Sequence, residues 1–349
     1  MTSTNISITL FFLLPILFFG QEKSEYKIHT IAFYNLENLF HPEDDPITFD
    51  NDRTPNGKDH WTYEIYNHKL SNMGKAISDI GKELTNNTPA IVGLAEIENR
   101  KVLEGLINTP TLRLKNYGIV HFNSPDRRGI DVALLYQKSM FKPKNTSAHQ
   151  LLIYDTNANK RIHTRDQLLV SGYLDGDLIH IIVNHWPSRR GGEAKSQYKR
   201  IKAAALNKKI TDSLFAINPY AKIVIMGDLN DNPNNQSVRK TLGAKHHKKD
   251  VNIKELYNPM YNMAKKGIGS LAWGDRWSLF DQIIVSANLL QNDYTTYRYY
   301  KAGIFNPEYL ITSRGKYKGY PFRSFANGSY TGGYSDHFPV YIHLIKEKR

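Results

Sequence analysis

The sequence predicts an α/β or α+β sandwich, and three observations lead to that prediction. Apolar runs of strand length, rich in β-branched residues, recur along most of the chain. Segments with helical periodicity lie between some of these runs. The runs follow one another in both hairpin and crossover order, which is typical of mixed sheets covered by helices.

The predicted strands are short and bounded by turn residues, which fits strands buried inside a sheet. They cover residues 28–36, 90–97, 131–136, 167–174, 178–186, 222–230, 279–286 and 339–345.

Two segments, 64–84 and 192–217, repeat apolar residues at helical spacing, and the second carries Lys and Arg on its other face. Residues 98–109 form a weaker third pattern. Three remaining stretches are interpreted as long surface loops, because long loops of compact domains often carry function: 40–62, 234–278 and 291–333. No repeat, low-complexity linker or domain boundary is visible, so a single domain is expected.

Composition limits the classes of protein and of site. The chain has 349 residues, of which 40% are hydrophobic, enough for a large core. It contains no cysteine, which excludes disulfides, thiolate nucleophiles and cysteine zinc sites, so a metal would be held by oxygen and imidazole ligands. The net charge of +13 favours a polyanionic partner, such as nucleic acid, an anionic membrane surface or a phosphorylated substrate.

The N-terminal segment predicts export. An apolar run over residues 8–19 is interrupted by Pro15 and is too short for a comfortable membrane span. We therefore predict a signal peptide over 1–20 and one mature domain over 21–349, secreted or periplasmic, without stable membrane association after cleavage. The alternative is an N-terminal membrane anchor.

Polar and acidic side chains recur at the ends of the apolar runs. A single residue of this kind usually belongs to a turn or a helix start. Asp228 and Asn230 differ, because a spacing of two on an extended segment places both on one side, where both can address one metal ion or phosphate. The residues at the run ends are Asn35, Glu96, His185, Asp228, Asn230, Asp336 and His337.

Their order along the chain is more specific than any one of them. It reads Asn35, Glu96, His185, "GDLN" (227–230), "DQIIVS" (281–286) and "SDH" (335–337). This order, over about residues 30–345, resembles the endonuclease/exonuclease/phosphatase superfamily, which includes pancreatic deoxyribonuclease. The resemblance implies a four-layered, deoxyribonuclease-like sandwich, in which two mixed β-sheets pack face to face with helices outside.

The resemblance also implies a divalent-metal site. Glu96 matches the main metal ligand, Asn35 helps to place the metal or the phosphate, and Asp336 is a further carboxylate on the metal side. Carboxylate and amide oxygens suit Mg²⁺, with Mn²⁺ or Ca²⁺ as alternatives.

Five residues match the catalytic positions of the family. Asp228 would orient or deprotonate the attacking water, and Asn230 would bind a phosphate oxygen. His337 would contact the scissile phosphate, with Asp281 holding its ring through a hydrogen bond, as oriented histidines require. His185 matches the second histidine of the deoxyribonuclease-like branch; the alternative is a core histidine at a strand end.

Basic and aromatic residues outside these motifs add candidate substrate contacts. Arg165 and Arg189 are predicted phosphate or substrate contacts, and solvated arginines are the alternative for both. The Tyr-, Lys- and Arg-rich stretch from 294 to 325 either stacks nucleic-acid bases or packs its aromatic rings on the sandwich.

The function predicted from these features is a secreted, divalent-metal-dependent phosphodiesterase, an endonuclease of low specificity that hydrolyses DNA or RNA as a monomer. The alternative is a phosphatase or phospholipase-C-like enzyme acting on a phosphorylated sugar or a sphingomyelin-type substrate. A non-catalytic binding module is disfavoured, because Glu96, Asp228 and His337 are all present.

Overall fold

The computed structural model describes residues 25–155 and 158–348. The predicted signal peptide lies outside the described residues and stays a prediction. Within the described part of the chain, no helix is both long and apolar enough to span a bilayer.

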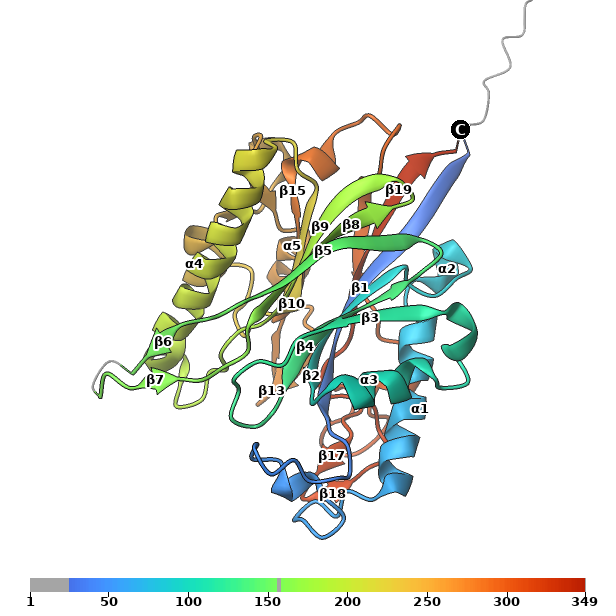
Figure 1. The fold of residues 1–349 in the computed structure, drawn as a ribbon, viewed down its shortest axis with the longest axis vertical. Coiled ribbons are helices and arrows are strands. Elements are labelled where there is room, and N and C mark those ends of the chain that lie inside the picture. Colours follow the sequence, from blue (N-terminus) through green and yellow to red (C-terminus); the bar gives the residue numbers. More distant parts are fainter. Residues whose placement is uncertain (1–24, 156–157, 349) are drawn as a thin grey trace, which may run out of the picture.

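Two large mixed sheets form the centre of the molecule (Figure 1). The first sheet contains, in spatial order, β16 (Arg298–Ile304), β19 (Val340–Glu347), β1 (Tyr26–Leu39), β2 (Ile91–Ile97), β4 (Asp131–Gln137) and β3 (Tyr117–His121). The second contains β11 (Ala244–Lys245), β12 (Leu256–Tyr257), β15 (Asp281–Ser286), β10 (Ile223–Asp228), β9 (Asp177–His185), β8 (Gln167–Leu174) and β5 (Phe141–His149).

The central strands are buried on both faces, which explains their near-continuous apolar sequences. In β1, Ile31 and Phe33 point into the core between the sheets, while Ala32 and Tyr34 point to the helical side. Because successive side chains of a strand point to opposite faces, β1 contributes both to the core between the sheets and to the core under the helices. Gly93 of β2 permits the close approach of the sheets, because a Cβ there would lie 2.4 Å from the sulfur of Met226 in β10.

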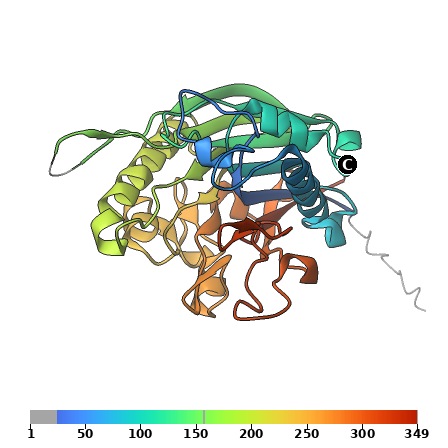
Figure 2. The same ribbon diagram turned by 90° about the horizontal axis from the view of Figure 1, so that it is seen from below.

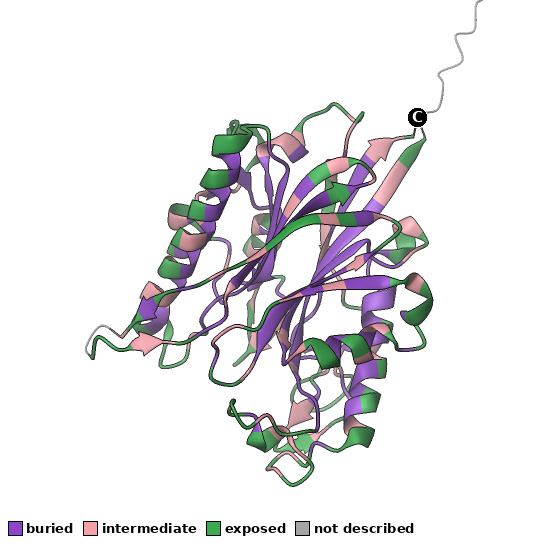
Figure 3. Ribbon diagram, in the orientation of Figure 1, coloured by how far each residue is buried: buried purple, intermediate pink, exposed green. Residues whose placement is uncertain are grey.

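Helices cover both outer faces of the sheet pair. α1 (Tyr63–Asp79) and α3 (Arg100–Ile107) pack on the first sheet through residues such as Met73 and Leu103, while α4 (Glu193–Ile217) packs on the second through Ala203. The purple, buried faces of these helices turn toward the sheets in Figure 3. The predicted four-layered sandwich is therefore confirmed.

Some predicted elements differ from the observed ones. The helix predicted over 64–84 is interrupted, because Gly81 adopts a left-handed φ of 69° between α1 and α2 (Lys82–Thr85). The interpretation of 291–333 as loop is wrong for β16, which pairs with β19 at the edge of the first sheet. Strands β3 and β5 were also not predicted, since both lie at sheet edges and β5 reads "FKPKNTSAH", largely polar.

Small elements decorate the end of the sandwich at which the parallel strands β1, β2, β9 and β10 finish. Figure 2 views the molecule from below, toward the loops at this end. These elements are β6 (Ile153–Tyr154), β7 (Arg161–Ile162), β13 (Leu271–Trp273), β14 (Arg276–Ser278), β17 (Phe325–Ala326) and β18 (Ser329–Tyr330), whereas α5 (Tyr261–Lys265) lies farther up in Figure 1.

Candidate active site

Three neighbouring strands of the second sheet place three predicted site residues in a row. Asp228 at the end of β10 pairs with Asp281 on β15 and with His185 on β9. Directly paired residues project from the same face of a sheet, so the strand register alone brings these side chains together. Gly227 makes the arrangement compatible with close packing, because a Cβ there would lie 2.3 Å from the carbonyl oxygen of Asn184.

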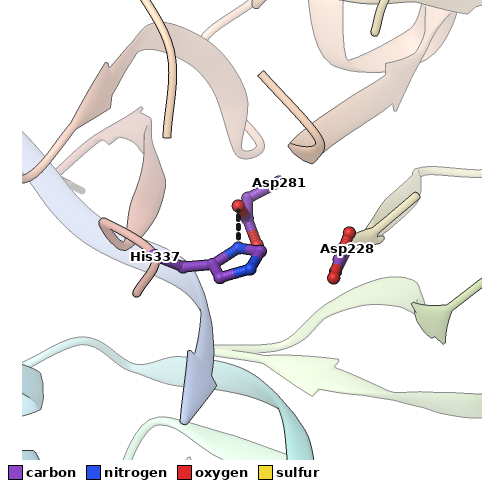
Figure 4. Close-up of side chains that lie close together, drawn as sticks. All are labelled: Asp228, Asp281 and His337. Carbon is purple, nitrogen blue, oxygen red and sulfur yellow. Dashed lines mark hydrogen bonds and ion pairs between the residues drawn. The ribbon is translucent and has the colours of Figure 1, made fainter. Parts of the chain in front are cut away.

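His337 completes this row from the other sheet, on the segment that leads into β19. Its Nδ1 donates to Oδ2 of Asp281 over 2.6 Å, the hydrogen bond expected from the sequence. Ser270 Oγ donates to the same carboxylate oxygen over 2.5 Å. Figure 4 shows the Asp281–His337 pair with the Asp228 carboxylate facing the ring. Both members of the pair are buried.

The buried charges of this group shift one another's pKa. Burial opposes a charged imidazole, but the carboxylates of Asp281, Asp336 and Asp228 raise the pKa of His337 well above its usual value. Burial raises the pKa of Asp228 to about 7; the positive His337 opposes this shift, and the negative Asp281 and Glu96 add to it. His337 is thus a cation that donates hydrogen bonds, next to a carboxyl group that exchanges protons near neutral pH.

His185 has the opposite character. Its Nε2 lies 3.6 Å from Oδ2 of Asp228 and 3.7 Å from Oε1 of Glu96. Burial lowers its pKa well below the usual value, and the cations Arg165 and Arg128 lower it further. The ring is therefore neutral at neutral pH and lies between the carboxylates of the two sheets.

Glu96 reaches the site through an irregularity in β2. On the β4 side the register shifts between Ala95 and Ile97, so Glu96 is the extra residue of a bulge there; on the other side the irregularity lies in β1, between Asn35 and Leu39. Glu96 has a φ of 59°, a left-handed conformation that costs a non-glycine residue about 1–3 kcal/mol. Bulges re-aim side chains next to active sites. The carboxylate is fixed by the backbone N–H of Asn38, which donates to Oε2 over 3.1 Å.

Asn35 connects the two sheets from the point where the regular pairing of β1 with β2 stops. Its Nδ2 donates to Oδ2 of Asp228 over 3.2 Å, while its Oδ1 accepts the backbone N–H of Glu37 over 3.0 Å. Its backbone carbonyl accepts the hydroxyl of Ser335 over 2.7 Å, which ties the segment before His337 to β1. The amide nitrogen thus faces the site, and the predicted metal contact of Asn35 stays a prediction.

An ionic cluster that is buried at Glu37 and Lys69 and exposed at Arg323 contacts the loop that carries Asp336. Glu37 accepts hydrogen bonds from the backbone N–H and the hydroxyl of Ser324, at 2.5 and 2.8 Å. Lys69 of α1 donates to the Glu37 carbonyl and to the same hydroxyl, and burial lowers its pKa to about 8. Arg323 lies 3.2 Å from Glu37 and 3.4 Å from Asp336, so it joins the cluster to the site.

Asn230 and Arg189 brace the loop that follows β10. Asn230 has a left-handed φ of 51°, and its Nδ2 donates to the Trp186 carbonyl over 3.0 Å. Arg189 donates to the Asn230 carbonyl over 2.9 Å, pairs with Asp231 over 2.9 Å and covers the Phe280 ring. Both residues thus use polar groups within the chain, and their predicted phosphate contacts stay predictions.

Arg165 is not among the side chains of the row formed by His185, Asp228 and Asp281. It is buried, with Nη1 donating to Asp126 over 3.0 Å and Nη2 to the Trp186 carbonyl over 2.8 Å. The positive charge of Arg165 helps to lower the pKa of His185. A direct substrate contact of Arg165 stays a prediction.

The family model for the endonuclease/exonuclease/phosphatase family matches residues 30–346. The chain belongs to this family. A search of curated proteins gives no match.

Solved structures similar to the chain share its fold at low sequence identity. A mannosyl-6-phosphatase of Bacteroides thetaiotaomicron is 16% identical, with a TM-score of 0.53, covering 90% of this chain and 99% of that one. D. rerio TDP2 complexed with single strand DNA product is 14% identical, with a TM-score of 0.52, covering 91% and 98%. A Bacteroides thetaiotaomicron protein of the same family is 16% identical, with a TM-score of 0.51, covering 93% and 96%.

The endonuclease/exonuclease/phosphatase family is metal-dependent, and the donors of this site fit a divalent cation. Among the described residues, Asp228, Asp281 and His337 bring ligand atoms within 4.8 Å of one another. Asp281 and His337 are already hydrogen-bonded to each other, but Oδ1 of Asp281 is buried without a partner in the described part of the chain. Glu96 and Asp336, the predicted ligands, provide carboxylates on the first-sheet side.

Several residues that surround this candidate site were not predicted. Ser270, which bonds Asp281, lies in a stretch interpreted as surface loop. Glu37 follows Asn35 by two positions, a spacing that would have pointed to it if β1 had been assumed to continue to residue 39. Lys69 sits at an apolar position of α1, and a lysine on a buried helix face is the available indication.

Proposed function

We propose that the chain hydrolyses phosphodiesters, with the Asp281–His337 pair and Asp228 as its catalytic centre. The observation that carries the proposal is the 2.6 Å hydrogen bond between Asp281 and His337 beside a carboxyl group whose pKa is about 7. A fixed cationic donor stabilises negative charge on a phosphate, and a base poised near neutral pH accepts a proton from water. Family membership supports a phosphoric ester hydrolase.

In the proposed reaction, the Asp228 carboxylate orients a water molecule and takes its proton as the water oxygen bonds to phosphorus. His337, held by Asp281, donates from Nε2 to a phosphate oxygen on which charge develops. The bond from phosphorus to the leaving oxygen breaks, that oxygen takes a proton from solvent water, and Asp228 returns the proton that it accepted to the solvent. Neutral His185 serves as a further donor between Asp228 and Glu96.

The residues proposed to hold Mg²⁺, or alternatively Mn²⁺ or Ca²⁺, are Glu96, Asn35 and Asp336. A bound divalent cation would neutralise phosphate charge and polarise a phosphate oxygen. The cluster of Glu37, Lys69 and Arg323 would keep Asp336 in place for this purpose.

We propose nucleic acid, DNA or RNA, as the substrate, cleaved internally with low sequence specificity. The loops beside the site-bearing strand ends carry exposed cations, which suit a polyanionic backbone. These cations are Arg127, Arg128, Arg190, Arg314, Lys316 and Lys318. The D. rerio TDP2 structure with single strand DNA product shows that this fold accommodates a nucleic acid in another protein.

We also propose export and cleavage of residues 1–20, supported by the apolar run over 8–19. N-terminal sequencing of the extracellular or periplasmic protein tests this proposal, and an unprocessed N-terminus in the cytoplasm would contradict it.

The substrate proposal is tested with the mature chain, 21–349, on plasmid DNA, single-stranded RNA, mannose 6-phosphate, an inositol polyphosphate and sphingomyelin. Each assay is run with Mg²⁺, Mn²⁺, Ca²⁺ or EDTA. We expect cation-dependent conversion of plasmid to nicked and linear forms. Intact nucleic acid together with phosphate release from a sugar phosphate, or headgroup release from the lipid, would overturn the nuclease proposal and leave a phosphatase or phospholipase.

Matched histidine variants test the centre itself. His337→Ala should abolish the activity, whereas His163→Ala, at an exposed histidine outside the site, should leave it unchanged. Full activity of the His337→Ala protein would contradict the proposed catalytic centre whatever the substrate.

A further inference from the structure

A cavity of about 530 Å³ lies beside the candidate site. One wall is the turn between β13 and β14, and the other is formed by the segment from Thr312 to Thr331. These orange and orange-red segments lie together in the view from below (Figure 2). The residues that line the cavity include Trp273, Tyr317, Tyr320, Phe322, Lys316 and Arg323.

The cavity is continuous with the catalytic region. Asp336 lines it, and Oδ1 of Asp336 lies 3.8 Å from Nε2 of His337. The wall is also braced against the site. Phe338, the residue after His337, stacks on Trp277 with ring centroids 6.1 Å apart, and Trp277 contacts Tyr320 at 5.8 Å. A group bound in this cavity would therefore be attached close to a phosphate at His337.

Two of the aromatic rings that line the cavity are open to solvent. Trp273 is 82% exposed and Tyr317 is 53% exposed. Large rings at such exposure gain nothing for the core, and exposed aromatic surface marks ligand or partner sites. The stretch from 294 to 325 also contains buried residues. Tyr297 and Arg298, at the start of β16, are both buried. Tyr300 is 52% exposed on β16, but the aromatic residues of the stretch that line the cavity are Tyr317, Tyr320 and Phe322.

The polar groups of the cavity are mostly engaged within the chain. Tyr320 donates its hydroxyl to Asp275 over 2.6 Å. Thr312 donates to the Pro321 carbonyl over 3.2 Å, and Thr331 donates to the Arg323 carbonyl over 2.5 Å. A sugar presents several hydroxyls that need such partners, whereas a flat base presents π-faces that need aromatic rings. The lining therefore favours a base.

We propose that this cavity is a nucleobase subsite, in which the base of the nucleotide next to the scissile phosphate stacks on Trp273 and Tyr317. The proposal rests on the proposed nuclease function and extends it to how the substrate is held. Lys316 supplies charge complementarity, because it forms no ion pair within the described residues and lies at the cavity beside the ring of Tyr317. Stacking on aromatic rings tolerates every base, which matches a nuclease of low sequence specificity.

Intrinsic fluorescence tests binding without any need for catalysis. Trp61 and Trp186 are fully buried, while Trp273 is 82% and Trp277 is 37% exposed, so a stacked base should quench mainly Trp273. We expect adenosine 5′-monophosphate, titrated in EDTA, to quench the emission, and Trp273→Phe to remove most of that change. Trp273→Ala and Tyr317→Ala should each weaken binding by about 5- to 150-fold, the equivalent of ~1–3 kcal/mol.

Tyr220→Ala, at another tyrosine that is 54% exposed, is the matched control and should bind the nucleotide normally. Since the replaced rings are exposed, all three alanine variants should keep the melting temperature of the parent protein. Equal competition by ribose 5-phosphate or mannose 6-phosphate would overturn the base assignment in favour of a sugar subsite. A nucleotide that causes no quenching would overturn the subsite altogether.

Cleavage then separates this inference from the proposed function. An oligonucleotide with one abasic tetrahydrofuran site should be cut about 5- to 150-fold more slowly next to that site than the parent oligonucleotide at the same position. The difference should vanish in Trp273→Ala. Equal rates for the two oligonucleotides would refute the subsite and leave the nuclease intact. Failure to cut either would refute the nuclease, while the fluorescence titration would still decide on the subsite.

Discussion

The two sheets contribute to the site in different ways. The second sheet supplies Asp281, Asp228 and His185 as paired residues on three adjacent strands, so their spacing follows from regular hydrogen bonding. The first sheet supplies Asn35 and Glu96 where its register breaks, and Glu96 has a left-handed φ of 59°. Regular register gives fixed positions for proton transfer, whereas bulges and loops project carboxylates to positions that a straight strand cannot reach.

This difference indicates a division of labour. The second-sheet row, with His337, is buried, and its members shift one another's pKa, which suits proton transfer and charge stabilisation. The first-sheet half gathers carboxylates around a strained backbone, which suits cation binding. The predictions below test whether the two halves separate experimentally.

The largest effect is expected from the second-sheet row. Asp228→Asn removes the proton acceptor and should lower kcat by about 10²- to 10⁴-fold. The Mg²⁺ concentration for half-maximal activity should change little, because the variant keeps its shape and its first-sheet carboxylates. Steady-state kinetics across a Mg²⁺ titration measures both quantities. A large rise in the Mg²⁺ requirement together with the fall in kcat would contradict the proposed separation of proton transfer from cation binding.

Glu96→Gln should show the reverse pattern. Losing one carboxylate of the cation site should raise the Mg²⁺ concentration for half-maximal activity by about 10- to 100-fold, by analogy with the losses on disturbing metal-site residues. Activity should return in part at high Mg²⁺ and disappear in EDTA. Isothermal titration with Mg²⁺ supplies a readout independent of turnover, and unaltered affinity would remove Glu96 from the cation site.

The pH dependence sharpens the assignment of Asp228. Its folded pKa of about 7 exceeds the usual 3.8, so the base is protonated and inactive below about pH 7. The rate should fall about tenfold per unit below that value and level off above it. A raised carboxyl pKa also means that the native state binds more protons than the unfolded state, so this group destabilises the fold increasingly from pH 4 to pH 7.

Asp228→Asn should therefore raise the melting temperature of the metal-free protein at pH 8 and leave it nearly unchanged at pH 4. A destabilised variant at pH 8 would show instead that the Asp228 carboxylate is held by favourable contacts.

The sequence predicted the second-sheet half better than the first, for a physical reason. Strand-end positions follow from apolar runs, and once the ends of β9, β10 and β15 are known, pairing places His185, Asp228 and Asp281 together. The run "KIVIMG" predicted the strand β10, and the motif "GDLN" that follows it predicted where the strand ends. The Asp281–His337 contact was also anticipated, through the family motif order rather than through spacing.

Bulges and loop contacts were beyond the reach of periodicity. Nothing in "GLAEIEN" indicates that Glu96 is an extra residue in the pairing with β4, and Ser270 meets Asp281 only because the β13–β14 hairpin folds back. Edge strands such as β5 lack an apolar run, since half their surface faces water. Such features depend on tertiary contacts between distant segments, which a single sequence does not display.

The smallest effect is expected from the loop cluster that supports the first-sheet half. Glu37→Gln keeps the shape of the side chain and can still accept from Ser324, but it removes the negative charge that faces Lys69 and Arg323. Asp336 should then be held less firmly. We expect a rise of a few-fold in the Mg²⁺ requirement and an unchanged kcat at saturating Mg²⁺.

Glu64→Gln, at an exposed position of α1, is the control for a surface charge change and should alter none of these quantities. Because Glu37 acts through Arg323 and the loop, high Mg²⁺ should rescue Glu37→Gln completely but Glu96→Gln only in part. A fall in kcat that Mg²⁺ does not rescue would instead connect the cluster to the second-sheet row, and the two halves of the site would have to be treated as one.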